Sequence, residues 1–65
     1  MNSIKSIREQ RGVSQAWLAH QLDIHRATLH NYEAGITEPP VSIYYQLAHI
    51  FHMQVDEVMP QATSV

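Results

Sequence analysis

The chain has 65 residues, no cysteine, and four Lys and Arg against six Asp and Glu, which gives a formal net charge of −2. A chain of this length is expected to fold as one small domain, and without cysteine it has neither a disulfide nor a thiolate zinc site to support its core. No apolar run approaches the length that spans a bilayer, and the N-terminus lacks the basic start and long hydrophobic middle of a signal peptide, so we expect a cytoplasmic protein.

A first helix is predicted from Ser3 to about Arg11, because Ser3 is a favourable N-cap residue and Gly12 can end a helix. Residues recur at helical spacing on its two sides, with Ile4 and Ile7 facing inward and Lys5, Arg8 and Arg11 facing outward. Judged by spacing alone, these cations form an ordinary solvated face. All four Lys and Arg lie in the first half of the chain. The negative net charge therefore does not refute DNA binding, because the placement of charge matters more than its sum.

The stretch from Ser14 to Gly35 predicts two short helices joined by a sharp turn. The Ser14 hydroxyl can cap the first helix, and Asp23 tolerates the positive φ that often ends one. The second helix is predicted roughly from Arg26 to Ala34, with Gly35 at its C-terminal end. The expected inward residues are Leu18, Ala19, Leu22, Ile24, Leu29 and Tyr32, and the outward residues are Arg26, Ala27, Thr28, His30 and Asn31. Arg, Thr and Asn hydrogen-bond to base edges or phosphates, and Ala can contact a thymine methyl, so the outward face is typical of a helix that reads DNA.

A fourth helix is predicted from near Ser42, after two prolines that cannot lie in its interior. We expect its core residues to be Ile43, Leu47, Ile50 and Phe51, with Tyr44 and Tyr45 widening the apolar stripe. His52 follows this helix at a point where the backbone has to turn. A last short helix is expected from about Val55 to Met59, stopped by Pro60, and residues 60–65 are predicted to be a flexible tail.

The motif and its flanks resemble the helix-turn-helix family of Cro and the phage repressors, the XRE family. The residues that carry the resemblance are Ser14, Gln15, Leu18, Ala19, Leu22, Ile24, Leu29, Tyr32, Glu33, Ala34 and Gly35, and in the flanks Ile7, Arg8, Pro39, Pro40, Leu47, Ala48, Phe51, Met53 and residues 55–58. The resemblance implies an all-α, five-helix, lambda-repressor-like domain over residues 1–59, with helices two and three as the helix-turn-helix. It also implies a sequence-specific transcriptional regulator, such as a repressor, whose partner is double-stranded DNA.

Within that resemblance, the helix beginning near His25 would lie in the major groove. Arg26 is the expected main base reader, assisted by Ala27, Thr28 and Asn31. The family uses a Gln at the position of Gln15 to hold the DNA backbone, and it pairs an Arg at the position of Arg8 with a Glu at that of Glu33. Lys5 and Arg11 are the remaining candidates for phosphate contacts. The loop from Ile36 to Val41 has one acid, Glu38, and no base, so its expected contribution is a backbone amide at Ile36 or Thr37.

Five histidines, His20, His25, His30, His49 and His52, stand without cysteine companions or an HExxH arrangement, so no metal and no cofactor is expected. His25 and His30 flank the reading face, where protonation would add charge opposite the phosphates; we expect DNA affinity to rise as the pH falls from about 7.5 to about 6. The chain has no phosphate-binding glycine loop and no recognisable serine–histidine–acid set, so it is not expected to be an enzyme.

Two further features leave alternatives open. Trp17 matches a position that is usually polar in the family; it either anchors a protein partner or packs against its own chain. Phe51, Val58 and Met59 would form a dimer surface if the protein pairs as its relatives do. The alternative to a bacterial or phage-encoded regulator is therefore an antitoxin-type interaction protein that binds a partner, with DNA binding secondary; a dimerising module that has lost DNA contact is a third alternative.

Overall fold

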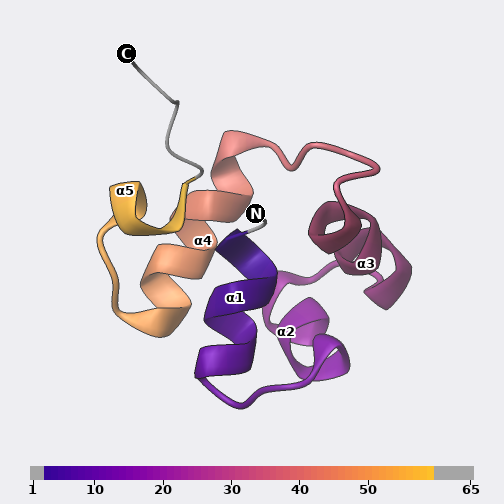
Figure 1. Ribbon diagram of the computed structural model, residues 1–65, viewed down its shortest axis with the longest axis horizontal. Helices are drawn as coiled ribbons and strands as arrows, with labels where there is room; N and C mark the ends of the chain where they lie inside the picture. Colours follow the sequence, from indigo (N-terminus) through magenta and orange to yellow (C-terminus); the bar gives the residue numbers. More distant parts are fainter. Residues whose placement is uncertain (1–2, 60–65) are drawn as a thin grey trace.

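The computed structural model describes residues 3–59, which form five helices and no strand (Figure 1). The helices are α1 (Ser3–Gln10), α2 (Gln15–Leu22), α3 (Arg26–Ala34), α4 (Val41–Phe51) and α5 (Val55–Val58). In Figure 1, α1 runs between a pair formed by α2 and α3 on one side and a pair formed by α4 and α5 on the other. The all-α, five-helix prediction is confirmed, and the tail predicted for residues 60–65 lies outside the described residues.

One hydrophobic core joins all five helices. Helix α1 packs against α3 and α5, α2 packs against α3 and α4, and α4 packs against α5. The buried apolar residues are Ile4, Ile7, Leu18, Ala19, Leu22, Leu29, Tyr32, Ile43, Tyr44, Leu47, Ala48, Phe51 and Val58. Ile24, in the turn between α2 and α3, is half-buried against this core. The inward set predicted for the helix pair is therefore confirmed, and it fixes which side of α3 is left to face outward.

Four of the described helices are followed by a residue in the left-handed region. Gly12 has φ 69°, Asp23 has φ 57°, Gly35 has φ 77° and His52 has φ 56°. After each of them the next amide bonds back to the carbonyl five residues earlier: Val13 N to Arg8 O at 3.2 Å, Ile24 N to Ala19 O at 3.0 Å, Ile36 N to Asn31 O at 3.0 Å, and Met53 N to Ala48 O at 2.8 Å. This pattern satisfies carbonyls that a helix end leaves unpaired. The predicted stops at Asp23 and Gly35 are confirmed.

Replacing His52 with Gly should stabilise the domain by about 0.5–1 kcal/mol, because relief of the left-handed strain exceeds the entropy that glycine adds to the unfolded chain. His49→Gly is the matched control: it places glycine inside α4, where it should lower the free energy of unfolding by about 1 kcal/mol. Urea denaturation of the two variants beside the parent protein measures both changes. A loss of stability in His52→Gly would show that its side chain contributes more than its backbone costs.

The prediction for α4 was wrong at Tyr45, whose side chain is 59% exposed. The buried stripe runs through Ile43, Tyr44, Leu47, Ala48 and Phe51. Successive helical residues are about 100° apart, so a buried stripe that reaches from Ile43 to Ala48 around the helix, with Phe51 near its centre, leaves Tyr45 facing solvent. The helix also begins at Val41, one residue before the predicted start, with Pro40 as its N-cap.

Two of the three residues expected to form a dimer surface are buried inside their own chain. Val58 has no exposed surface and Phe51 is 5% exposed, since both pack into the core of their own chain. Neither side chain is available to a partner in this fold, and that part of the prediction was wrong. Met59 is half-buried, so a role for it stays a prediction.

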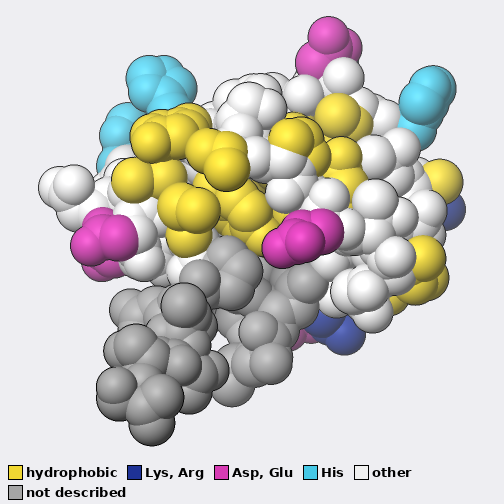
Figure 2. Space-filling model, turned by 90° about the horizontal axis from the view of Figure 1, so that it is seen from above, with side chains coloured by type: hydrophobic (Ala, Val, Ile, Leu, Met, Phe, Trp, Pro, Cys, Tyr) yellow, Lys and Arg dark blue, Asp and Glu magenta, His cyan; other side chains and the backbone are white. Residues whose placement is uncertain are grey.

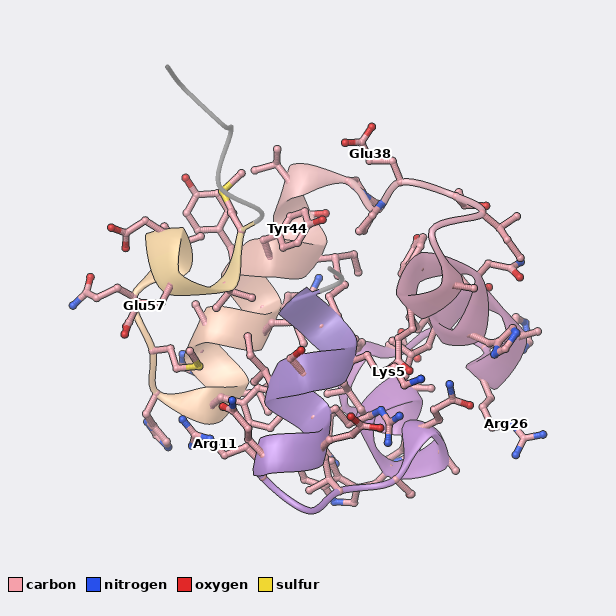
Figure 3. All side chains as sticks on the ribbon, in the orientation of Figure 1. Lys5, Arg11, Arg26, Glu38, Tyr44 and Glu57 are labelled. Atoms are coloured by element: carbon pink, nitrogen blue, oxygen red, sulfur yellow. The ribbon has the colours of Figure 1, made fainter. Side chains whose placement is uncertain are left out.

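Tyr44 makes the stability of the domain depend on pH in the alkaline range. Burial raises the pKa of the Tyr44 phenol above 10.0, and the nearby Glu38 carboxylate raises it further. Glu38 lies by the start of α4 in Figure 3, on a different side of the molecule from Arg26. Because the folded state holds the phenolic proton more tightly than the unfolded state, this contribution to stability is complete below pH 10.0 and is lost as the pH rises through the raised value.

We therefore expect the free energy of unfolding to fall as the pH rises above about 10, and to fall less steeply in Tyr44→Phe. Chemical denaturation at several pH values between neutral and strongly alkaline measures the two slopes. Equal slopes would mean that Tyr44 is not the group responsible. Tyr45→Phe, which alters an exposed phenol on the same helix, is the control.

Candidate nucleic-acid interface

Local signals place α2 and α3 next to each other with one side of α3 exposed. The Ser14 hydroxyl accepts a hydrogen bond from the Trp17 amide at 3.0 Å, which caps the start of α2. Asp23 ends α2, and His25 is the N-cap residue of α3, although its imidazole makes no capping hydrogen bond. Leu29 and Tyr32 then hold the inner side of α3 in the core. The turn between the helices is therefore short and fixed by backbone geometry.

The outward side of α3 carries the residues predicted to read bases. Arg26, Ala27 and His30 are exposed, whereas Thr28 and Asn31 are half-buried. Arg26 extends from the first turn of α3 into solvent, at the edge of the molecule (Figure 3). The start of α3 is thus its most accessible part, and this end could enter a groove first.

A buried carboxylate ties α3 to both preceding helices. Glu33 accepts hydrogen bonds from Arg8 Nε at 2.7 Å, from Arg8 Nη2 at 3.1 Å and from Gln15 Nε2 at 3.0 Å. Arg8 Nη1 also donates to the Val13 carbonyl at 2.9 Å. The side chains of Glu33 and Arg8 are 3% and 13% exposed. The hydrogen bonds that Arg8 donates to Glu33 raise the pKa of Arg8, against the opposing effect of burial. The ion pair expected between Arg8 and Glu33 is present, and it fixes α3 relative to α1.

Gln15 has a structural contact that the sequence did not predict. Its half-buried amide donates to Glu33, so it belongs to the network beneath α3 as well as to the start of α2. An amide nitrogen carries two N–H groups, and one hydrogen bond to Glu33 leaves the second. The expected contact between Gln15 and the DNA backbone therefore stays a prediction, with Glu33 fixing where that amide lies.

A recess opens between α1, α2 and α3. Its lining residues are Lys5, Arg8, Gln15, His30, Glu33 and Ala34. Lys5 extends from α1 toward α3 in Figure 3. Two cations, Lys5 and Arg8, and one carboxylate, Glu33, give the lining a formal charge of +1 when His30 is neutral. The recess is therefore a positive site close to the outward side of α3, in a chain whose net charge is negative.

Arg11 lies elsewhere. Its guanidinium carbon is 5.5 Å from the centre of the Phe51 ring, a distance suited to a cation–π contact. In Figure 3 it lies beside α4, on the opposite side of the molecule from Arg26. Arg11 therefore links the turn after α1 to α4, and its placement does not support the expected phosphate contact near the reading helix.

The backbone amides of the loop after α3 are already used. Both Ile36 N and Thr37 N donate to the Asn31 carbonyl, at 3.0 and 3.3 Å. The prediction that one of these amides binds a phosphate was therefore wrong, because each completes the end of α3. Gly35 could have predicted that these amides are engaged, since a left-handed residue at a helix end directs the following amide back to the helix. Thr37 is exposed, so any contact with DNA would use its hydroxyl.

The described histidines do not gather into a metal site. All five are exposed, and residues 3–59 contain no group of three or more His, Cys, Asp and Glu side chains arranged to hold a metal ion. Figure 2 shows histidines in two separate places, at opposite ends of one face, with hydrophobic surface between them. Within the same described part of the chain, every helix is too short or too polar to cross a membrane.

A family model described as Helix-turn-helix matches residues 4–58. The chain belongs to this family. The match extends from α1 to the last residue of α5, so it covers the whole core as well as the α2–α3 pair. The resemblance to the Cro and phage-repressor type is thereby confirmed. Comparisons with curated proteins and with solved structures find no match.

Membership of the helix-turn-helix family indicates how α2 and α3 are used. In a helix-turn-helix domain, the second helix of the motif enters the major groove while the first crosses the DNA backbone. Here these helices are α3 and α2. The domain is thus a DNA-binding regulatory domain in the general sense of its family, which is generally non-enzymatic.

Proposed function

We propose that this helix-turn-helix protein is a sequence-specific transcriptional regulator of the Cro and phage-repressor type, encoded by a bacterium or phage and acting in the cytoplasm as a repressor. The observation that carries the proposal is the division of α3 into two sides. Leu29 and Tyr32 are buried, while Arg26 and Ala27 are exposed on its first turn. A short helix whose inner side is fixed and whose outer side carries donors suits the major groove.

The base contacts follow from the chemistry of the side chains. Arg26 would donate two hydrogen bonds to a guanine, and Asn31 would pair with an adenine through its amide. Ala27 would contact a thymine methyl, and Thr28 would bond to either kind of base edge. Because Thr28 and Asn31 are half-buried, their reach is shorter than that of Arg26. Arg26 is therefore the main reader.

The backbone contacts are assigned to side chains around the same surface. Helix α1 contributes Lys5, and the start of α2 contributes Gln15. The N-cap of α3 contributes His25, and α3 itself contributes His30. The exposed Thr37 offers its hydroxyl. Arg8 is engaged with Glu33 and Arg11 with Phe51. Few cations remain to displace counterions from DNA, so the salt dependence per protomer should be shallow.

A dimer on two half-sites is the proposed binding unit. A helix of nine residues reads only a few base pairs, and helix-turn-helix proteins gain a useful site by binding two half-sites roughly 34 Å apart. Since Phe51 and Val58 are buried, the surface that pairs the two copies has to lie elsewhere. Sedimentation with and without a duplex containing the selected site would give the stoichiometry.

Selection from a randomised duplex pool tests the proposal, and Arg26→Ala tests the mechanism. We expect a palindromic site, and we expect the variant to lose about 1–3 kcal/mol of binding at one base position per half-site. Lys5→Ala is the comparison, because loss of a phosphate contact weakens all sequences alike. If Arg26→Ala weakens every sequence equally, Arg26 binds phosphate; if no sequence is enriched, the isolated chain is not a sequence reader.

A second candidate function is supported by exposed aromatic surface. Trp17 is 42% exposed and Tyr45 is 59% exposed. An antitoxin-type protein would use such residues to bind a partner protein. Because Trp17 is the only tryptophan, its fluorescence reports directly on such a complex. A stoichiometric partner whose binding requires Trp17 would favour this alternative.

A further inference from the structure

Two large apolar side chains are exposed on the outer side of α4. Val41 is 54% exposed and Tyr45 is 59% exposed, and they are two of the four large hydrophobic residues that are exposed within residues 3–59. They lie one turn apart, so they share one side of the helix. Because neither side chain belongs to the hydrophobic core, both are available to a partner.

A groove beside Tyr45 extends this apolar surface. Its volume is about 300 Å³, and the residues that line it, from α2 and α4, are Gln21, Tyr45, Gln46, His49 and Ile50. None of these described lining residues is Lys, Arg, Asp or Glu. A shallow, uncharged groove between two packed helices accepts the apolar side of an amphipathic helix.

Acidic side chains border the apolar surface. Burial, and then the Glu38 carboxylate, raise the pKa of the Tyr44 phenol, so Glu38 lies close enough to the start of α4 to act on it. Asp56 and Glu57 are exposed on α5, which packs against α4. Figure 2 looks onto the side of the molecule where Glu38 lies in Figure 3, and it shows hydrophobic surface with acidic side chains on either side.

The charge of this part of the chain decides which occupant fits. From Ile36 onward the sequence has three acids and no Lys or Arg, a formal charge of −3 when His49 and His52 are neutral. Such a surface repels DNA phosphates, and a second copy would bring acids against acids. Residues 60–65 contain no Lys or Arg, so they do not supply the opposite charge either. A positively charged partner protein is the occupant that the charge favours.

We propose that the outer side of α4 together with α5, the α4–α5 face, binds an amphipathic and positively charged helix of another protein. The apolar side of that helix lies on Val41, Tyr45 and the groove, and its Lys or Arg side chains pair with Glu38 and Asp56. The inference goes beyond the proposed function, because the outward side of α3 takes no part in it. The face would let the domain recruit a partner while α3 is bound to DNA.

An NMR titration of the ¹⁵N-labelled protein with a synthetic helical peptide tests the proposal. The peptide carries Leu on one side and Lys on the other, and two comparison peptides have Gln or Glu in place of Lys. We expect the Lys peptide to shift the amide signals of residues 36–40, α4 and α5, and to leave those of α3 unchanged. It should bind about tenfold more tightly than the Gln peptide, and the Glu peptide should not bind.

Two double variants separate the α4–α5 face from the net charge of the protein. Glu38→Gln with Asp56→Asn neutralises two acids of the face, and it should weaken binding of the Lys peptide about fivefold. Glu9→Gln with Asp23→Asn neutralises two exposed acids elsewhere, and it should weaken binding less than about twofold. Asn tolerates the left-handed conformation at position 23. Glu57 is left unchanged, because its carboxylate accepts a hydrogen bond from the N-cap amide of α5 at 2.8 Å.

Tyr45→Ala tests the apolar part of the face. It removes an exposed ring that the core does not need, so the variant should fold and should bind the Lys peptide at least about threefold more weakly. Ile36→Ala, which shortens an exposed apolar side chain outside α4, is the control and should bind as the parent protein does. Circular dichroism checks that every variant is folded.

Four outcomes would contradict the inference. The two double variants could lose affinity equally, or the Gln peptide could bind as tightly as the Lys peptide, and in both cases the acids of the face would not select the partner. Shifts spread over α1, α2 and α3, or no binding at about 1 mM peptide, would remove the face as a docking site. If signals of the face move with protein concentration alone, the face pairs two copies instead. The duplex selection tests DNA binding separately, so the proposed function can stand or fail independently.

Discussion

Replacing Arg8 with Met should lower the free energy of unfolding by about 3 kcal/mol, because it leaves the buried Glu33 carboxylate without its bidentate partner. Arg8 is 13% exposed, so solvent compensates part of the loss and the lower end of the range for buried pairs applies. At about 0.05–0.15 kcal/mol per residue, a domain of this length has a total stability of roughly 3–10 kcal/mol. The substitution should therefore remove between about a third and all of the domain's free energy of unfolding.

Two further variants show whether the loss comes from the stranded charge. Lys5→Met removes an exposed cation one turn earlier on α1 and should cost less than about 1 kcal/mol. The double variant Arg8→Met with Glu33→Leu should recover part of the stability, since no buried charge is then left unpaired. Urea denaturation of the parent protein, Arg8→Met, Glu33→Leu and the double variant gives the coupling between positions 8 and 33. Equal losses in Arg8→Met and Lys5→Met would contradict the role assigned to the pair.

Leu29→Ala should lower the free energy of unfolding by about 2–5 kcal/mol and abolish DNA binding as a consequence. Leu29 has no exposed surface and anchors the inner side of α3 in the core. Removing most of its side chain loses apolar burial and leaves a cavity that the surrounding helices cannot fully close. In a small domain this cost is comparable to the whole stability.

Ile36→Ala is the matched control, because it shortens an aliphatic side chain that is 70% exposed, in the turn that follows α3. Its effect should stay within about 0.5 kcal/mol. Thermal unfolding followed by circular dichroism, together with anisotropy on the selected duplex, separates folding from binding. A stable Leu29→Ala protein would mean that the inner side of α3 is not packed as described.

The helix pair was predictable because its limits depend on neighbouring residues. Ser14 caps α2 through its own hydroxyl, and Asp23 and Gly35 adopt the left-handed conformation that ends a helix, so the bounds of α3 follow from local signals. Tyr45 was misplaced because an apolar side chain next to a buried stripe fits either side of a helix, and only the packing of α4 against α2 and α5 decides between them.

The candidate site was less predictable, since its parts come from distant segments. The bond between Gln15 and Glu33 joins residues 18 positions apart, and the recess requires the spatial arrangement of three helices. No periodicity in the sequence specifies those positions. The contact of Arg11 with Phe51 likewise depends on where α4 passes α1, so the polar side of α1 could not be divided in advance into its different roles.

The separation between the two sides of α3 has a consequence for how such a protein changes over time. The side chains that hold the helix, Leu29, Tyr32 and Glu33, are all buried, whereas Arg26 and Ala27 are exposed. If α3 reads DNA as proposed, substitutions at the exposed positions can therefore redirect the domain to another operator at little cost to its folding. Duplicated copies of this gene could diverge in target while keeping one scaffold, and a designer could exploit the same freedom.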